Sequence, residues 1–152
     1  MTANRNLRAK NTLASKMARP GGRTMAEAVR SAETGLESHR EEGMRSLVLL
    51  LDRLDAGCAA RDKDAEARVY EYASAFADMA GFFDTGPLYV AAFSLCEASD
   101  RMTAGGCWRW PAVEVHVRAM RLILADGRET SEASRTLLEG LASVVARIPK
   151  AG

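Results

Sequence analysis

The chain has 152 residues, which suits one domain whose core buries roughly 70% of the unfolded surface. Its apolar content of 47% and charged content of 27% are typical of a soluble globular protein and exclude a low-complexity chain. No apolar run approaches the ~18 residues of a membrane span, and the N-terminus lacks the apolar segment of a secretion signal. Three cysteines without Cys-x-x-Cys spacing favour a reduced compartment, so we expect a cytoplasmic protein.

The net charge of +1 hides an uneven distribution along the chain. The first 23 residues hold six of the 21 Lys and Arg residues and none of the 20 acids, so the remainder carries a net −5. We therefore expect a basic N-terminal arm over residues 1–22 and a single domain over residues 23–152. The arm is either a solvated terminus or a contact for an acidic partner, such as nucleic acid or an anionic surface. Because it contains no aromatic side chain, stacking on bases has no support.

The first predicted helix follows the turn residues Arg19-Pro20-Gly21-Gly22. Thr24 and Glu27 form a capping-box pattern that opens the helix, and we expect it to run to about Asp55. An apolar stripe with a period of 3.6 follows its length: Val29, Ala32, Leu36, Leu47, Leu50, Leu51 and Leu54. Arg40 and Gly43 interrupt this stripe, and residues 33–42 are almost wholly polar. We expect the second half to lie in the core and the first half to project, bend or meet a partner.

The next two helices form a predicted hairpin over residues 64–102. Asp62 or Asp64 caps the first of them, residues 84–87 form the connection, and the second ends at Gly105-Gly106. The hairpin holds every Phe and Tyr of the chain: Tyr70, Tyr72, Phe76, Phe82, Phe83, Tyr89 and Phe93. We expect this aromatic cluster to build the core, because large rings bury the most apolar surface.

Two more helices complete the prediction, one starting at Pro111 and one capped by Thr130 or Ser131. Trp108 and Trp110, in the loop before Pro111, either cap the open end of the domain or anchor a partner. No segment alternates like a strand. The fold class is therefore an all-α, antiparallel up-and-down bundle of about five helices joined by short loops.

The sequence carries no catalytic, metal-binding or phosphate-binding motif, so we expect a non-enzymatic protein without a cofactor. His116 lies about 60° from the centre of its helix stripe, where it is either a half-buried packing residue or a phosphoacceptor. His39 lies in the polar half of the first helix, where acidic neighbours favour the imidazolium form, a poor nucleophile. We expect His39 to be a solvated surface side chain.

The second helix reads Ala-Ser-Ala-Phe-Ala-Asp-Met-Ala-Gly-Phe-Phe over residues 73–83. It resembles the active helix of histidine-phosphotransfer (Hpt) domains, in which an Ala-His pair precedes a Lys and a run of small residues. Ser74 stands where the phosphorylated His would be, and Ala77 stands where the Lys would be. The resemblance implies a four-helix core and a docking surface for response-regulator receiver domains, but not the phosphotransfer reaction.

A second resemblance rests on several segments spread along the chain. They are Arg-Pro-Gly-Gly-x-Thr, Ala-Glu-Thr-x-Leu-Glu, Ala-Phe-Ser-Leu-Cys and Val-His-Val-Arg-Ala-Met-Arg-Leu. These are similar to the alphaproteobacterial chemotaxis protein CheE family. The resemblance implies an association with chemotaxis or two-component signalling.

The resulting hypothesis is an Hpt-like adaptor that binds a receiver domain through the outer face of the 64–102 hairpin. The predicted partner-binding residues share one side of the second helix: Tyr70, Ser74, Ala77, Asp78 and Gly81. Three alternatives stay open. The chain could be a phosphorelay protein that uses His116, a protein that binds acidic surfaces through residues 1–22, or a homodimer formed through the polar half of the first helix.

Overall fold

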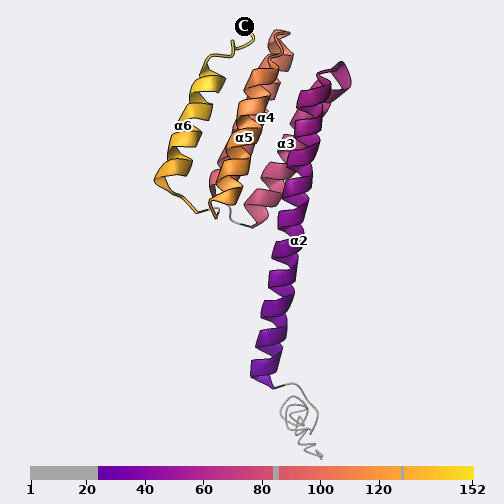
Figure 1. Ribbon diagram of the computed structural model, residues 1–152, viewed down its shortest axis with the longest axis vertical. Helices are drawn as coiled ribbons and strands as arrows, with labels where there is room; N and C mark the ends of the chain where they lie inside the picture. Colours follow the sequence, from indigo (N-terminus) through magenta and orange to yellow (C-terminus); the bar gives the residue numbers. More distant parts are fainter. Residues whose placement is uncertain (1–23, 84–85, 128) are drawn as a thin grey trace, which may run out of the picture. The chain divides into compact units, whose positions relative to one another are not determined.

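The computed structural model describes residues 24–83, 86–127 and 129–152, and the predicted arm of residues 1–22 lies outside them. The described residues form helices and no strands (Figure 1). The helices are α2 (Met25–Ala60), α3 (Lys63–Phe82), α4 (Gly86–Gly105), α5 (Trp110–Ala125) and α6 (Glu132–Ala146). This confirms the predicted all-α helical bundle.

Side-chain caps define three of the helix starts. The backbone N–H of Glu27 donates to Thr24 Oγ1 over 3.2 Å, while Glu27 Oε2 accepts from the Thr24 N–H over 3.0 Å. Asp62 caps α3 by accepting from the Ala65 N–H over 2.7 Å, and Ser131 caps α6. Each cap satisfies a backbone donor that the first turn leaves without a helical partner. The capping box at Thr24 is confirmed, and of the two predicted alternatives at each other start, Asp62 and Ser131 are the caps.

Helix α2 ends five residues later than predicted, at Ala60 rather than Asp55. The sequence prediction treated Ala56-Gly57 as a stop, but Leu54 and Cys58 on either side are both buried in the core. Tertiary packing of this last turn therefore outweighs the low helix propensity of Gly57.

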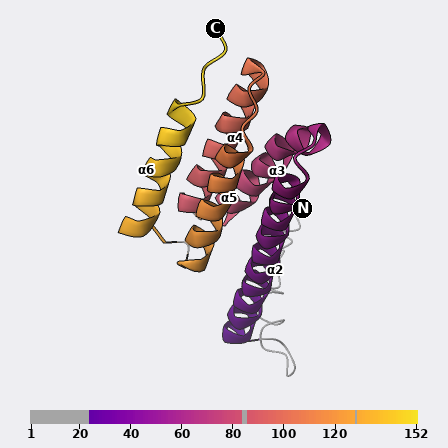
Figure 2. The same cartoon turned by 45° about the horizontal axis from the view of Figure 1, so that its top comes forward.

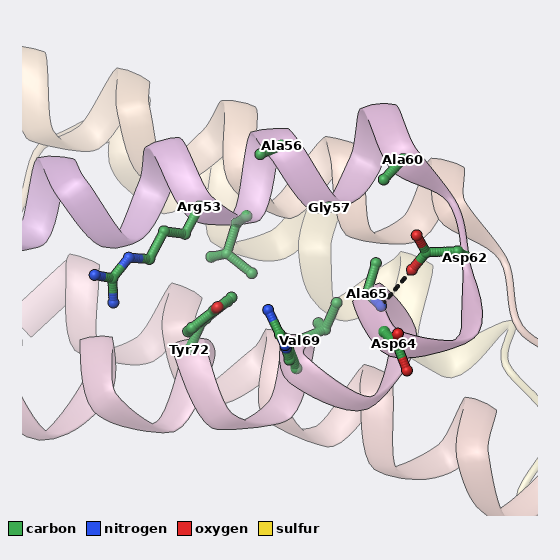
Figure 3. A pocket seen from close by; sticks show the side chains of 11 residues that line it. Arg53, Ala56, Gly57, Ala60, Asp62, Asp64, Ala65, Val69 and Tyr72 are labelled. Carbon is green, nitrogen blue, oxygen red and sulfur yellow. Dashed lines mark hydrogen bonds between the residues drawn. The ribbon is translucent and has the colours of Figure 1, made fainter.

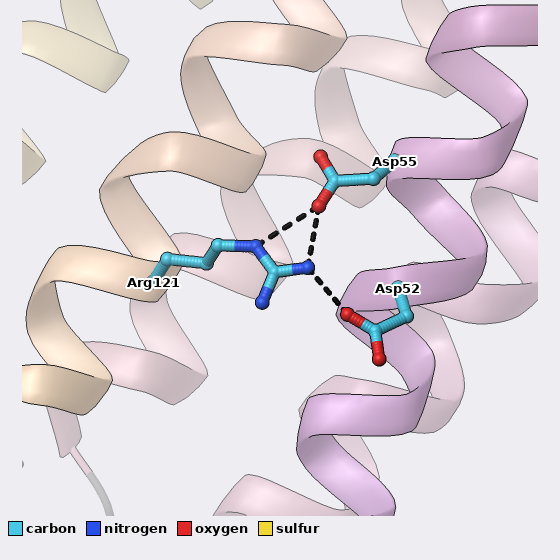
Figure 4. Close-up of polar contacts among 3 residues, drawn as sticks. All are labelled: Asp52, Asp55 and Arg121. Atoms are coloured by element: carbon cyan, nitrogen blue, oxygen red, sulfur yellow. Dashed lines mark hydrogen bonds and ion pairs between the residues drawn. The ribbon is translucent and has the colours of Figure 1, made fainter.

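The polar contacts between helices fix their relative directions within residues 41–152. Arg121 of α5 donates to Asp52 and Asp55 of α2 (Figure 4), and Arg61 at the end of α2 pairs with Glu114 near the start of α5. Residues near the end of α5 thus contact the middle of α2, whereas residues near the start of α5 contact the end of α2. The two helices are therefore antiparallel. The up-and-down order places α4 and α6 in parallel, since consecutive helices alternate in direction.

Helix α4 lies at the centre of this bundle and packs against α3, α5 and α6 (Figures 1 and 2). Its predicted inner face is confirmed, because every member is buried: Leu88, Ala91, Ala92, Leu95, Ser99 and Met102. The same core cluster contains mainly aliphatic side chains of the other helices, including Leu47, Leu51, Val69, Val113, Met120 and Leu141. The small alanines of α4 allow the neighbouring helix axes to approach closely.

The prediction that the Phe and Tyr side chains build the core is wrong for most of them. Of the seven Phe and Tyr side chains only Phe76 is buried, while Tyr72 and Phe83 are half-buried. The other four, Tyr70, Phe82, Tyr89 and Phe93, are exposed. Aliphatic residues fill the centre of the bundle instead.

The two halves of α2 have different environments along one continuous helix. Residues 24–42 are exposed without exception, whereas buried residues recur from Gly43 onward. The contacts separate residues up to Arg40 from the compact unit Glu41–Gly152. The predicted packing of the second half into the core is confirmed.

Gly43 has a packing role that the sequence did not reveal. A Cβ atom at this position would lie 2.1 Å from the Cε2 and Cζ atoms of the Phe83 ring. The ring therefore rests directly on the α2 backbone, and the glycine that interrupts the apolar stripe makes room for it.

We predict that Gly43→Ala destabilises the protein by about 1–2 kcal/mol, because the Phe83 ring must leave its site. Gly140→Ala is the matched control, since a Cβ atom there meets nothing within 4 Å and the substitution gains helix propensity of about 1 kcal/mol. Urea denaturation of both variants measures the difference. Equal stabilisation by the two alanines would contradict the close packing at Gly43.

Candidate functional site

The predicted partner-binding residues lie along one side of α3, but they do not form a uniform exposed face. Tyr70, Asp78 and Gly81 are exposed, and Ser74 is half-buried. Ala77 is only 6% exposed and belongs to the core cluster, so its place in the docking face was wrong. At 100° per residue Ala77 lies roughly 70° from the centre of the buried stripe, nearer than the other four residues, and the bundle covers it there.

This side of α3 faces its neighbour α4. A Cβ atom on Gly81 would lie 3.3 Å from Cδ2 of Tyr89 in α4, so glycine keeps the two helices close at this point. Cys96 of α4 lies near Asp78 of α3. Its pKa is raised, first by burial and then by the negative charge of Asp78. The candidate surface is therefore built from both helices of the hairpin.

Helix α4 contributes two aromatic residues that the sequence analysis did not assign to the site. Tyr89 and Phe93 stack with their ring centroids 6.2 Å apart, and they are 43% and 57% exposed. Both residues fall outside the predicted inner face of α4, and their spacing of four places them together on its outer side. That spacing indicates an exposed aromatic pair, whereas the expectation that large rings build the core assigned both rings to the interior. We call Tyr70, Asp78, Gly81, Tyr89 and Phe93 the hairpin face.

A groove of about 290 Å³ adjoins the hairpin face between α4 and α6. Val90 and Phe93 line one wall, and Leu138 and Val145 line the other. At one end Arg101 donates to the backbone carbonyl of Val145 over 3.0 Å and pairs with Glu97. Phe93 thus belongs both to the hairpin face and to the groove, which extends the apolar surface beyond the two helices predicted to form it.

His116 is fully buried rather than half-buried as predicted from its angle on α5. Its Nδ1 lies 2.6 Å from the carbonyl oxygen of Ala112, and its Nε2 lies 2.9 Å from Ser94 Oγ. A carbonyl can only accept, so Nδ1 carries the proton and the Ser94 hydroxyl donates to Nε2. Burial lowers the pKa of His116, although the Ala112 carbonyl opposes this shift, and the ring is neutral at pH 7.

These contacts occupy both ring nitrogens of His116. A phosphoryl donor cannot reach either nitrogen in this conformation, so the geometry gives no support to His116 as a phosphoacceptor. His39 is exposed, as predicted, and lies within the exposed first part of α2.

The Trp pair packs at the end of the bundle. Trp110 is buried and Trp108 is half-buried, and their rings make an edge-to-face contact with centroids 5.4 Å apart. Of the two predicted roles, this packing supports the cap over the end of the bundle.

A second cavity, of about 350 Å³, lies between the second half of α2 and α3 (Figure 3). The Arg53 side chain lies over the Tyr72 ring, with its guanidinium carbon 5.9 Å from the ring centroid. Asp62 and Asp64 line the opposite end of the cavity. Asp62 is already engaged as the cap of α3, and the mixed charges give the cavity no preference for one sign of ligand.

Several site classes find no counterpart in the part of the chain that the structure describes. There, no three His, Cys, Asp or Glu side chains lie together in a way that could hold a metal ion. None of the described helices is long and apolar enough to cross a membrane. Comparison with known proteins finds no matching family model, no matching curated protein and no matching solved structure.

We predict that the buried neutral His116 makes the protein less stable in mild acid. Because its pKa is lowered on folding, the unfolded chain binds more protons below the ordinary value of 6.5. The free energy of unfolding should therefore begin to fall as the pH drops through about 6.5 and decrease further toward the folded-state pKa. Urea midpoints measured across this range check the effect.

The control for this prediction is His116→Gln, which lacks the titrating ring. It should be destabilised at every pH but should lose the part of the pH dependence centred just below 6.5. An unchanged pH profile in His116→Gln would show that another group causes the acid sensitivity.

Proposed function

We propose that this protein is a non-enzymatic helical-bundle adaptor that binds a response-regulator receiver domain through the hairpin face. The observation that carries the proposal is the stacked pair Tyr89 and Phe93, which remains exposed on a bundle whose core is mainly aliphatic. Exposed aromatic side chains that adjoin one another are typical of protein-binding surfaces, where they contribute most of the affinity. The likeness of residues 73–83 to Hpt domains indicates the class of partner.

The composition of the hairpin face suits close contact with another protein. Gly81 leaves the α3 backbone accessible beside Tyr89, and small residues at such a point allow a partner helix to approach. Asp78 and Asp100 are exposed on α3 and α4, and neither takes part in an ion pair with another described residue. An apolar centre with an acidic rim favours a partner that presents apolar side chains flanked by Lys or Arg.

The absence of a reactive group on the hairpin face supports an adaptor role. In the Hpt resemblance Ser74 stands at the position of the phosphorylated histidine, and in this protein it is half-buried. A serine phosphate lacks the high-energy N–P bond that drives reversible transfer to an aspartate. The adaptor would therefore bind a receiver without exchanging phosphate with it.

We predict that Phe93→Asp weakens binding to a receiver domain by about 30-fold, because loss of a central aromatic contact typically costs about 2 kcal/mol. Gly81→Arg should abolish binding, because a side chain at this position crowds the Tyr89 ring and covers the hairpin face. Isothermal titration against a panel of purified receiver domains measures both effects, and circular dichroism verifies that the helix content is unchanged.

Leu122→Asp is the matched control, because Leu122 on α5 has the same 57% exposure as Phe93 but lies outside the hairpin face. It should leave the dissociation constant within about twofold of the unsubstituted chain. Binding that survives both Phe93→Asp and Gly81→Arg, or a failure to bind any receiver in the panel, would overturn the proposal.

A further inference from the structure

A groove of about 630 Å³ lies between the end of α5 and the start of α6. Leu122 and Ile123 form the α5 wall, and Leu137 belongs to the α6 wall. Ala133 lies about one helical turn before Leu137, so the two residues line the same side of α6. Leu122 is 57% exposed and Leu137 is half-buried, so the apolar lining faces solvent. This surface belongs to helices other than the two that form the hairpin face.

One end of this groove is acidic. Asp126, which follows the last residue of α5, and Glu132, in the first turn of α6, line the groove and are exposed. The Ser131 hydroxyl donates to Asp126 over 3.0 Å, which holds this carboxylate beside the start of α6. Residues 126–132 contain three acids and one arginine, a net charge of −2, and the described lining residues include no Lys or Arg. Apolar walls with a negative end favour an apolar ligand that carries positive charge.

Both hydroxyl side chains among the described lining residues are already engaged in α6. The Ser134 hydroxyl accepts from the Ser131 N–H over 2.8 Å and donates to the Ser131 carbonyl over 2.9 Å. The Thr136 hydroxyl donates to the Glu132 carbonyl over 3.0 Å. Sites for small molecules usually offer a few polar groups that fix the orientation of the ligand. This groove instead offers apolar shape and charge, which are the features that an amphipathic helix uses when it binds in a groove.

We propose that this groove is a second docking site, which binds an amphipathic helix of a partner protein through apolar residues flanked by Lys or Arg. Helices α5 and α6 lie side by side and run antiparallel, so a partner helix in the groove would pack against both (Figure 1). The proposal does not depend on the hairpin face, which belongs to α3 and α4. Two separate docking surfaces allow one protein to join two partners.

Fluorescence anisotropy of a labelled peptide tests this proposal on the full chain. The probe is two copies of Leu-Lys-Lys-Leu-Leu-Lys-Leu, an amphipathic basic helix, and its control replaces each Lys with Glu. We expect the Lys peptide to bind about tenfold more tightly than the Glu peptide, because the acidic end of the groove repels the latter. The double variant Asp126→Asn, Glu132→Gln should reduce this preference. The matched double variant Asp78→Asn, Asp100→Asn, at exposed positions on α3 and α4, should retain it.

Leu122→Asp separates the apolar contact from general attraction between charges. It adds a negative charge and yet should weaken binding of the Lys peptide about tenfold, because part of an apolar wall is lost. Val115→Asp is the matched control, since Val115 lies two turns earlier on the same side of α5, is 39% exposed and does not line the groove. It should retain the affinity within about twofold. Circular dichroism verifies that both variants keep their helix content.

Amide chemical shifts of the nitrogen-15-labelled chain locate the bound peptide, and we expect the largest changes at Leu122, Ala133 and Leu137. Weaker binding of the Lys peptide in Phe93→Asp but not in Leu122→Asp would place the peptide on the hairpin face and overturn this inference. Equal affinity for the two peptides, equal effects of Leu122→Asp and Val115→Asp, or no binding of the Lys peptide would also overturn it. The receiver titration is independent of these outcomes, because Leu122→Asp is expected to bind the receiver normally.

Discussion

Burial of the inner face of α4 is the constraint on which the rest of the described bundle depends. Leu88, Leu95 and Met102 of this face have no solvent exposure, and the alanines between them let three neighbouring helices pack at close range. Each of those neighbours turns a mainly aliphatic stripe toward α4. A helix covered by three others cannot rotate without exposing part of that face, so its orientation also fixes which of its residues point outward. The exposed positions of Tyr89 and Phe93 follow directly from this.

The polar groups of the bundle are arranged so that few of them disturb this core. His116 lies in the core as a neutral ring. The Ala112 carbonyl of its own helix accepts from one ring nitrogen, and the Ser94 hydroxyl of α4 donates to the other. Burying a charged imidazolium there would cost much more than burying the neutral ring, which is why its pKa is lowered. The charged contacts stay at the rim, where Arg121 joins Asp52 and Asp55 in partly exposed ion pairs that orient α5 against α2 more than they stabilise it.

Most Phe and Tyr side chains lie at the surface of this bundle although their size favours burial, and small residues fill much of its interior. The bundle is filled by aliphatic residues and alanine, whereas four of the seven Phe and Tyr side chains lie at the surface. Where a ring does approach a helix closely, glycine makes the room: Gly43 lies under Phe83 and Gly81 lies beside Tyr89. Rings that are held in place by such contacts and still face solvent form a preorganised surface, which is the property on which the proposed binding role depends.

The sequence by itself determined the helical fold, the order of the helices, the capping box at Thr24 and the inner face of α4. These features depend on local chemistry, namely the 3.6-residue period, turn residues and side chains that satisfy the first backbone donors. The tertiary structure decided which borderline positions became buried. Ala77 and His116 both lie away from the centres of their stripes, and packing of the bundle covers them. The outward position of Tyr89 and Phe93, and the length of α2 beyond Gly57, were decided in the same way, because packing between helices outweighs the local preference of each residue.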